Sequence, residues 1–258
     1  MLDRLTVDDG FLVFDHDPHV EAWAREAHRI ACSVALEPDK CGPENLRHQR
    51  TWFVGVDALP NGPDGSIGNV PLVGPWRGQL PDLPLHPAQL SIIYPGYPKR
   101  DSDESEANHR YRITRSAAHV DGLLPTGALR RRFAMEYHAY ILSIPLNAVP
   151  RSPTVVWRGS QKIMQSALQE AIGSRVPAKV DITQAYQEAR RKVFETCPQV
   201  PLELEVGQAA VLHPFILHGT QPWGPESRAP EKDATQEGRM IAFFRPECAG
   251  GAAEWLSL

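Results

Sequence analysis

Short runs of apolar, β-branched and aromatic residues recur along most of this chain, and turn residues separate them. Runs of this length, bounded by proline, glycine and aspartate, are typical of the strands of a sandwich or barrel. They predict strands at residues 11–14 (FLVF), 51–56 (TWFVGV), 89–94 (QLSIIY), 109–116 (HRYRITRS), 132–144 (RFAMEYHAYILSI), 153–157 (PTVVW), 202–206 (LELEV), 209–217 (AAVLHPFIL) and 239–245 (RMIAFFR).

Three other segments repeat their apolar residues at helical spacing, at about residues 17–32, 161–172 and 182–196. In the last of these, Asp181 is in position to cap the helix, with Gln184 three residues further on. Such apolar stripes are typical of helices that pack against a sheet. The pattern therefore predicts a mainly β fold with flanking helices, of the α+β class.

Two segments lack either pattern. Residues at about 57–105 form a Pro/Gly-rich loop region, and residues at about 222–238 are charged and proline-bearing, which indicates an exposed insertion between two strands. A long irregular segment often carries function, although a linker between two domains would look similar. Neither side is complete as a domain, so we predict a single domain over residues 1–258.

Composition narrows the class of protein. The chain has 258 residues, 42% of them hydrophobic, with 24 prolines, 19 glycines and a net charge of −4. This balance favours a turn-rich globular fold and gives no sign of a nucleic-acid or polybasic membrane partner. The four cysteines lie far apart, and no apolar run could span a bilayer. We expect a soluble cytoplasmic protein. Its oligomeric state stays open.

The candidate chemistry begins with His119 and Asp121, which follow a predicted strand two residues apart. In extended chain these side chains point to the same face, so an imidazole nitrogen and a carboxylate oxygen can reach one ion. An open site with nitrogen and oxygen ligands suits Fe(II) or a similar divalent ion. Taken alone, the pair is explained equally well by Asp121 capping the turn at Gly122.

A third ligand would complete a facial triad. His218 ends a predicted strand, and Arg239 opens the next one. His213 is a rival ligand, but an odd number of residues separates it from His218, which predicts opposite faces. An arginine can bind a carboxylate through two parallel hydrogen bonds, as a dicarboxylate co-substrate would require; a surface salt bridge is the alternative role for Arg239.

Several motifs together resemble the phytanoyl-CoA dioxygenase-like family of Fe(II)/2-oxoglutarate-dependent oxygenases, over most of the chain. They are DDGFLVF near the start, HVD at 119–121, RGSQK at 158–162, VGQAAVLHPFILHGT at 206–220 and Arg239. The chain departs from the family at Arg158, Gln161 and Gln208. The stretch between His218 and Arg239 is longer than usual, which indicates an insertion at 222–238 and leaves Arg245 as the alternative to Arg239.

The resemblance implies a double-stranded β-helix, or jelly roll, with His119, Asp121 and His218 holding Fe(II). It implies that Arg239 and Thr220 bind the far carboxylate of 2-oxoglutarate, with Arg115 and Tyr111 as further candidates for that ligand. The implied reaction uses O2, decarboxylates 2-oxoglutarate to succinate and hydroxylates a small-molecule substrate.

The substrate is expected near Tyr97 and Arg112, where basic and aromatic residues gather. These residues indicate an anionic or polar molecule, although a solvated strand edge would have the same composition. Two other functions stay open: a cupin-like metal-dependent isomerase or dioxygenase that does not use 2-oxoglutarate, and a catalytically silent binding protein on the same barrel.

Overall fold

A computed structural model of the chain describes residue 5, residues 9–224 and residues 238–258. The strands are β1 (Phe11–Phe14), β2 (Leu46–Arg47), β3 (Trp52–Gly55), β4 (Gln89–Ile93), β5 (Leu123–Thr126), β6 (Arg131–Ala134), β7 (Ile141–Pro145), β8 (Thr154–Trp157), β9 (Gln199–Leu202), β10 (Ala209–Leu212), β11 (His218–Thr220) and β12 (Arg239–Phe244). The α-helices are α2 (Pro18–Val34), α3 (Glu106–Thr114), α4 (Ser160–Ile172), α5 (Thr183–Thr196) and α6 (Gly251–Ser257), and the 3-10 turns are η1 (Pro38–Lys40) and η2 (Pro177–Lys179).

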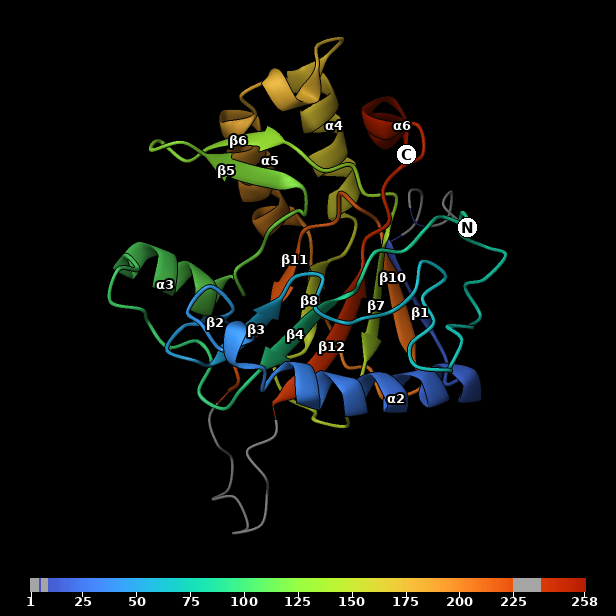
Figure 1. Cartoon of the computed structure of the whole chain (residues 1–258). Helices are drawn as coiled ribbons and strands as arrows, with labels where there is room; N and C mark the ends of the chain where they lie inside the picture. Colours follow the sequence, from blue (N-terminus) through green and yellow to red (C-terminus); the bar gives the residue numbers. More distant parts are fainter. Residues whose placement is uncertain (1–4, 6–8, 225–237) are drawn as a thin grey trace.

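Two antiparallel sheets face each other (Figure 1). The larger has seven strands in the order β1-β10-β7-β12-β4-β3-β2, and the smaller has the order β11-β8-β9. Between them lies an apolar layer to which Ile141, Val156 and Leu212 belong. Since residues paired across strands point to the same side, this layer identifies the inner face of each strand. The functional side chains described below lie on that inner face.

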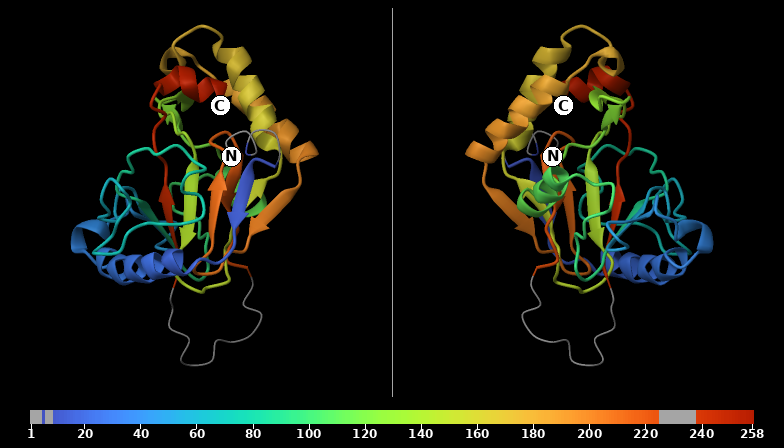
Figure 2. Two further views of the ribbon diagram at one scale, coloured as in Figure 1. Left: turned by 90° about the vertical axis from the view of Figure 1, so that its right-hand side faces the viewer. Right: turned by 90° about the vertical axis from the view of Figure 1, so that its left-hand side faces the viewer.

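The helices cover the outside of this barrel. In Figure 2, α2 lies beside the seven-stranded sheet, whereas α4, α5 and α6 gather at one end of the molecule. Trp23 of α2 is fully buried, with its ring centre 5.6 Å from that of Phe244, and its Nε1 donates to the carbonyl oxygen of Gly65. Burying a side chain of this size stabilises the fold by roughly 2–3 kcal/mol. This one side chain therefore joins α2 to the sheet and to the Pro/Gly-rich loop region.

The mainly β class with flanking helices is confirmed, as are the three predicted helices. Asp17 caps α2 by accepting from the backbone N–H of His19 and Val20. The predicted N-cap of α5 was wrong by one residue, because the N-cap is Ile182; Asp181, just before it, accepts from the N–H and hydroxyl of Thr183. Within the described residues, no helix is both long enough and apolar enough to cross a bilayer.

Four strand predictions were wrong in type or in extent. Residues 109–116 lie mostly in the helix α3, because the Ser105 side chain accepts from the N–H of Asn108 and caps its first turn. The run 132–144 is split into β6 and β7, and the strand expected at 202–206 lies earlier, as β9. The run 209–217 stops at His213, whose Nδ1 accepts from the N–H of Phe215 and turns the chain.

The predicted insertion at 222–238 falls largely on residues outside the described part of the chain. The insertion between β11 and β12 therefore stays a prediction from the sequence. The assignment of residues 1–258 to a single domain also stays a prediction.

Candidate metal centre

His119 and His218 face each other through a pair of backbone hydrogen bonds. The N–H of His119 donates to the carbonyl oxygen of His218 at 2.8 Å, and the N–H of His218 donates back at 3.0 Å. This reciprocal pair brings two segments that are distant in sequence into close register. The imidazole rings consequently lie with their centres 4.6 Å apart.

Asp121 completes a three-residue cluster with these histidines. Its Oδ1 lies 3.3 Å from Nε2 of His119, and its Oδ2 lies 3.7 Å from Nε2 of His218. One ligand atom from each of the three residues lies within 4.8 Å of the other two. Among the described residues, this is the one group of histidine, cysteine and carboxylate side chains with such a spacing. The structure therefore brings the three predicted ligands together.

The protonation of both rings follows from their other nitrogen. Nδ1 of His119 lies 3.0 Å from the carbonyl oxygen of Ala117, and Nδ1 of His218 lies 3.1 Å from that of Ile216. A carbonyl oxygen can only accept, so each Nδ1 must carry the proton in the neutral ring. Each Nε2 then keeps its lone pair and presents it to the cluster. Histidine ligands of protein metal sites are commonly oriented in this way.

The pKa values of His218 and Asp121 favour a neutral ring and an ionised carboxylate, the forms that bind a metal ion. Burial lowers the pKa of His218 to about 4, so its ring is neutral at physiological pH. Burial alone would raise the pKa of Asp121, but the histidines, when they carry a proton on Nε2, and the guanidinium of Arg245 outweigh burial and hold that pKa well below its usual value. Two lone pairs and one carboxylate thus converge with no proton between them. A divalent cation would satisfy all three, so the residues fit an Fe(II) ion.

The cluster opens into a cavity of about 180 Å³. Trp52, Val54 and Phe243 form its apolar part, and Gln89, Ser91, Thr154, Thr220 and Arg245 provide polar groups. Thr154 pairs with Thr220 across β8 and β11, so both side chains point inward. The hydroxyl of Thr154 is buried and has no hydrogen-bond partner among the described residues. The cavity therefore offers an unused hydrogen-bonding group beside the metal ligands.

Arg239 lies on the same inner face but lines a neighbouring cavity of about 440 Å³. Its side chain is 4% exposed, and burial lowers its pKa to about 10, which leaves it charged at neutral pH. Nη2 donates to the carbonyl oxygen of Ser152 at 2.6 Å, whereas Nε and Nη1 have no partner among the described residues. A buried cation with unsatisfied donors is costly, and a carboxylate on one edge of the guanidinium would satisfy at least one of them. The residue fits a carboxylate ligand and is not a surface salt bridge.

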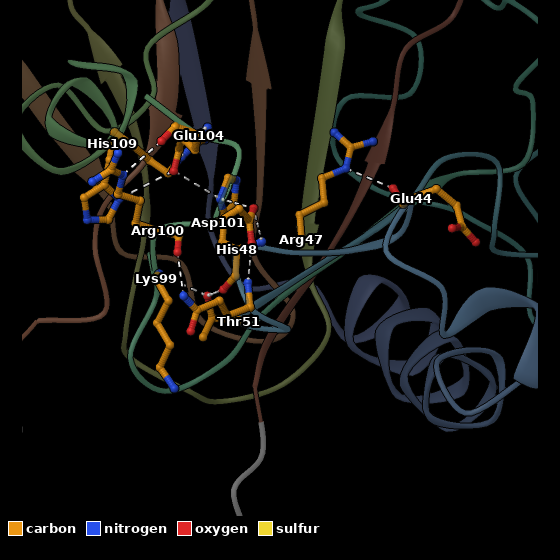
Figure 3. A network of polar contacts seen from close by, with 11 residues as sticks. Glu44, Arg47, His48, Thr51, Lys99, Arg100, Asp101, Glu104 and His109 are labelled. Atoms are coloured by element: carbon orange, nitrogen blue, oxygen red, sulfur yellow. Dashed lines mark hydrogen bonds and ion pairs between the residues drawn. The ribbon is translucent and has the colours of Figure 1, made fainter. Parts of the chain in front are cut away.

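Tyr97 and Arg112, the predicted substrate residues, do not line either cavity. The ring of Tyr97 contacts that of Trp52 with centres 5.9 Å apart, and Arg112 donates to Glu104 at 3.0 Å. Glu104 also lies near His48 and His109, and Asp101 accepts from the backbone N–H of His48 (Figure 3). This network supports the wall of the cavity that Trp52 forms.

Tyr111 and Arg115, the further candidates for 2-oxoglutarate, make other contacts. The Tyr111 hydroxyl donates to the carbonyl oxygen of Ala118 at 2.7 Å, one residue before the ligand His119. The guanidinium of Arg115 lies over the ring of Phe194, 4.6 Å from its centre. His213 is buried outside the metal cluster, with burial lowering its pKa to about 4. Tyr111, Arg115 and His213 are absent from the lining of the cavity at the metal cluster.

Two residues of the cavity carry no sequence motif that marks them. Thr154 and Gln89 reach the site through strand pairing, opposite Thr220 and Phe243 respectively. Their inward side could have been inferred only from the register of those pairs.

No known protein-family model matches this chain, and no curated protein has significant sequence similarity to it. Among solved structures, it resembles SnoK, described as a non-haem α-ketoglutarate-dependent carbocyclase from nogalamycin biosynthesis. The identity is 14%, the TM-score is 0.50, and the match covers 97% of this chain and 88% of SnoK.

Two other solved structures show weaker likeness. EctD from S. alaskensis, solved with 2-oxoglutarate and 5-hydroxyectoine, is 13% identical with a TM-score of 0.43, over 94% of this chain and 73% of EctD. AviO1 from Streptomyces viridochromogenes Tue57 is 16% identical with a TM-score of 0.41, over 96% and 94% of the two chains. On the likeness to SnoK, the chain has the same fold as that protein, a double-stranded β-helix.

Proposed function

We propose that this chain is a non-haem Fe(II)- and 2-oxoglutarate-dependent oxygenase that hydroxylates a small molecule. The observation that carries the proposal is the convergence of His119, Asp121 and His218 on one point, with both Nε2 lone pairs directed at it. A bound Fe(II) would supply the oxidative chemistry, in which O2 is activated, 2-oxoglutarate is decarboxylated to succinate and the substrate is hydroxylated.

His119, Asp121 and His218 would hold the metal and leave positions on it open for other ligands. Arg239, whose Nε and Nη1 are unsatisfied, binds the far carboxylate of 2-oxoglutarate along one edge of its guanidinium. Thr220 and Thr154 add hydroxyl groups from the facing sheet, close to Ser152, which already contacts Arg239. The co-substrate would thus extend from the metal ligands toward Arg239 along the inner face of β12.

The substrate side of the site is the wall formed by Trp52, Val54 and Phe243. This wall excludes water and accepts an apolar part of the substrate, while Gln89 and Ser91 provide hydrogen bonds. Direct roles for Tyr97, Arg112, Tyr111 and Arg115 stay predictions, as do the cytoplasmic location and the exact reaction.

Anaerobic titration of the protein with Fe(II) and then 2-oxoglutarate tests the proposal. A weak visible charge-transfer band should develop only when both are present. The variant Arg239→Gln should bind Fe(II) normally but require at least tenfold more 2-oxoglutarate, since a charged hydrogen bond contributes about 1.5–3 kcal/mol. Arg158→Gln, which removes an exposed arginine that faces Asp9, is the matched control.

The outcomes separate the competing functions. Iron binding without the band in well-folded protein would point to a cupin-like metal enzyme that does not use 2-oxoglutarate. Failure to bind iron would point to a catalytically silent binding protein.

A further inference from the structure

Arg245 joins the metal ligand Asp121 to the neighbouring strand. Its Nη1 lies 3.4 Å from Oδ2 of Asp121, and its Nη2 donates to Oε1 of Gln89. The backbone is held as well, because the carbonyl oxygen of Arg245 lies 3.1 Å from Nε2 of His86. The side chain is 21% exposed and lines the cavity of the metal ligands. The guanidinium is therefore placed beside the metal position without belonging to the triad.

Arg245 is the one lysine or arginine among the described residues that line this cavity. In the metal-free site its positive charge balances the carboxylate of Asp121, whose side chain is 12% exposed. A divalent ion that binds Asp121 must compete with this guanidinium, and it leaves the cavity with two surplus positive charges. Without Arg245, the surplus would be one. Charges this close interact strongly where water is largely excluded.

A dicarboxylate carries two negative charges: its far carboxylate pairs with Arg239, and its near carboxylate would offset part of the surplus beside the metal ligands. The contact with Gln89 keeps the guanidinium in the cavity when Asp121 turns to the ion. We infer that Arg245 couples the binding of the metal to that of the dicarboxylate co-substrate: it weakens binding of the ion alone and favours the ion together with the dianion. This inference rests on the proposed function. Coupling of this kind is reciprocal, so each ligand tightens the other by the same factor.

Equilibrium binding of Mn(II) to the full chain tests the coupling without turnover. Free Mn(II) is measured by electron paramagnetic resonance, without and with saturating 2-oxoglutarate, and the ratio of the two dissociation constants is the coupling factor. We expect a factor of about ten or more for the wild type. For Arg245→Met we expect tighter Mn(II) binding in the absence of 2-oxoglutarate and a coupling factor reduced about tenfold. Arg245→Lys should keep most of the coupling because it keeps the charge.

Arg158→Met is the control for removal of an arginine outside the cavity, and Arg245→Gln provides a second neutral variant if the methionine variant folds poorly. A coupling factor in the neutral variants equal to that of the wild type would overturn the inference, as would weaker binding of Mn(II) alone. The proposed function fails in a distinguishable way. In that case the wild type binds no Mn(II), or binds Mn(II) with no effect of 2-oxoglutarate.

Discussion

Nδ1 of His218 lies 3.1 Å from the carbonyl oxygen of Ile216, two residues earlier in the chain. His119 makes the same type of contact with Ala117 at 3.0 Å. Each ring is thus held by its own chain and needs no partner from elsewhere in the fold. This local contact determines which nitrogen faces Asp121, and it orients both rings as histidine ligands of metal sites are commonly oriented.

Removing a ligand should abolish metal retention and leave the fold intact. His119→Ala and Asp121→Ala each delete one donor of the triad, and the His119 side chain is 42% exposed, so its truncation costs little packing. Metal content after dialysis, together with the far-ultraviolet circular dichroism spectrum, measures the two effects. His213→Asn is the control and should retain the metal, because His213 lies outside the cluster. Unchanged metal content in the alanine variants would show that the triad is misassigned.

Gly122, next to Asp121, should tolerate no side chain. Its φ is +76°, and an added Cβ would lie 2.4 Å from the carbonyl oxygen of Glu136. We expect Gly122→Ala to lower the free energy of unfolding by about 3 kcal/mol, combining backbone strain with the clash. Gly127→Ala is a matched control, since Gly127 has φ +66° with nothing within 4 Å of the added Cβ. It should cost about 1 kcal/mol. Equal decreases in the free energy of unfolding, measured with urea, would show that the contact with the carbonyl oxygen of Glu136 adds nothing to the cost.

Thr154→Val should separate stability from binding. The Thr154 hydroxyl is buried without a partner among the described residues, so replacing it with a methyl group should stabilise the ligand-free protein by about 1 kcal/mol. If the hydroxyl serves 2-oxoglutarate, the same change should weaken its binding about fivefold. Thermal unfolding and the anaerobic titration measure the two effects. A variant with higher stability and unaltered 2-oxoglutarate affinity would remove Thr154 from the co-substrate site.

Acid should destabilise the metal-free protein partly through His213. Burial lowers the pKa of this residue to about 4 from an ordinary value near 6.5. Between these two pH values the unfolded chain binds more protons, so the free energy of unfolding decreases as the pH falls through this window. The loss for this one group is about 3 kcal/mol. His218, whose pKa is also lowered to about 4, adds a similar loss in the metal-free protein.

His213→Asn isolates the first contribution, because the asparagine oxygen can still accept from the N–H of Phe215. The variant should show a smaller decrease in unfolding free energy between pH 6.5 and pH 4 in urea titrations. An unchanged pH dependence would mean that His213 is not the titrating group.

Helix caps and the periodicity of apolar residues predicted much of the fold. The prediction failed where a helix cap was the one clear sign of a helix and the residues after it resembled a strand. The helix α2 could be predicted because its N-cap Asp17 and its buried face both lie within one segment. The helix α3 could not, since none of its residues is fully buried and its one clear signal is the cap at Ser105. Helix formation there depends on contacts such as the ion pair between Arg112 and Glu104.

The sequence by itself predicted the candidate metal ligands, because His119 and Asp121 are two residues apart and His218 directly follows a run of β-type residues. The tertiary structure decided the rest of the site. The pairing of β8 with β11 places Thr154 beside the ligands, and the pairing of β12 with β4 places Arg245 close to Gln89. It also left Arg239 buried with two free donors. These contacts depend on the pairing register of strands that are distant in the sequence. The spacing of residues within one segment does not show which residues that pairing brings together.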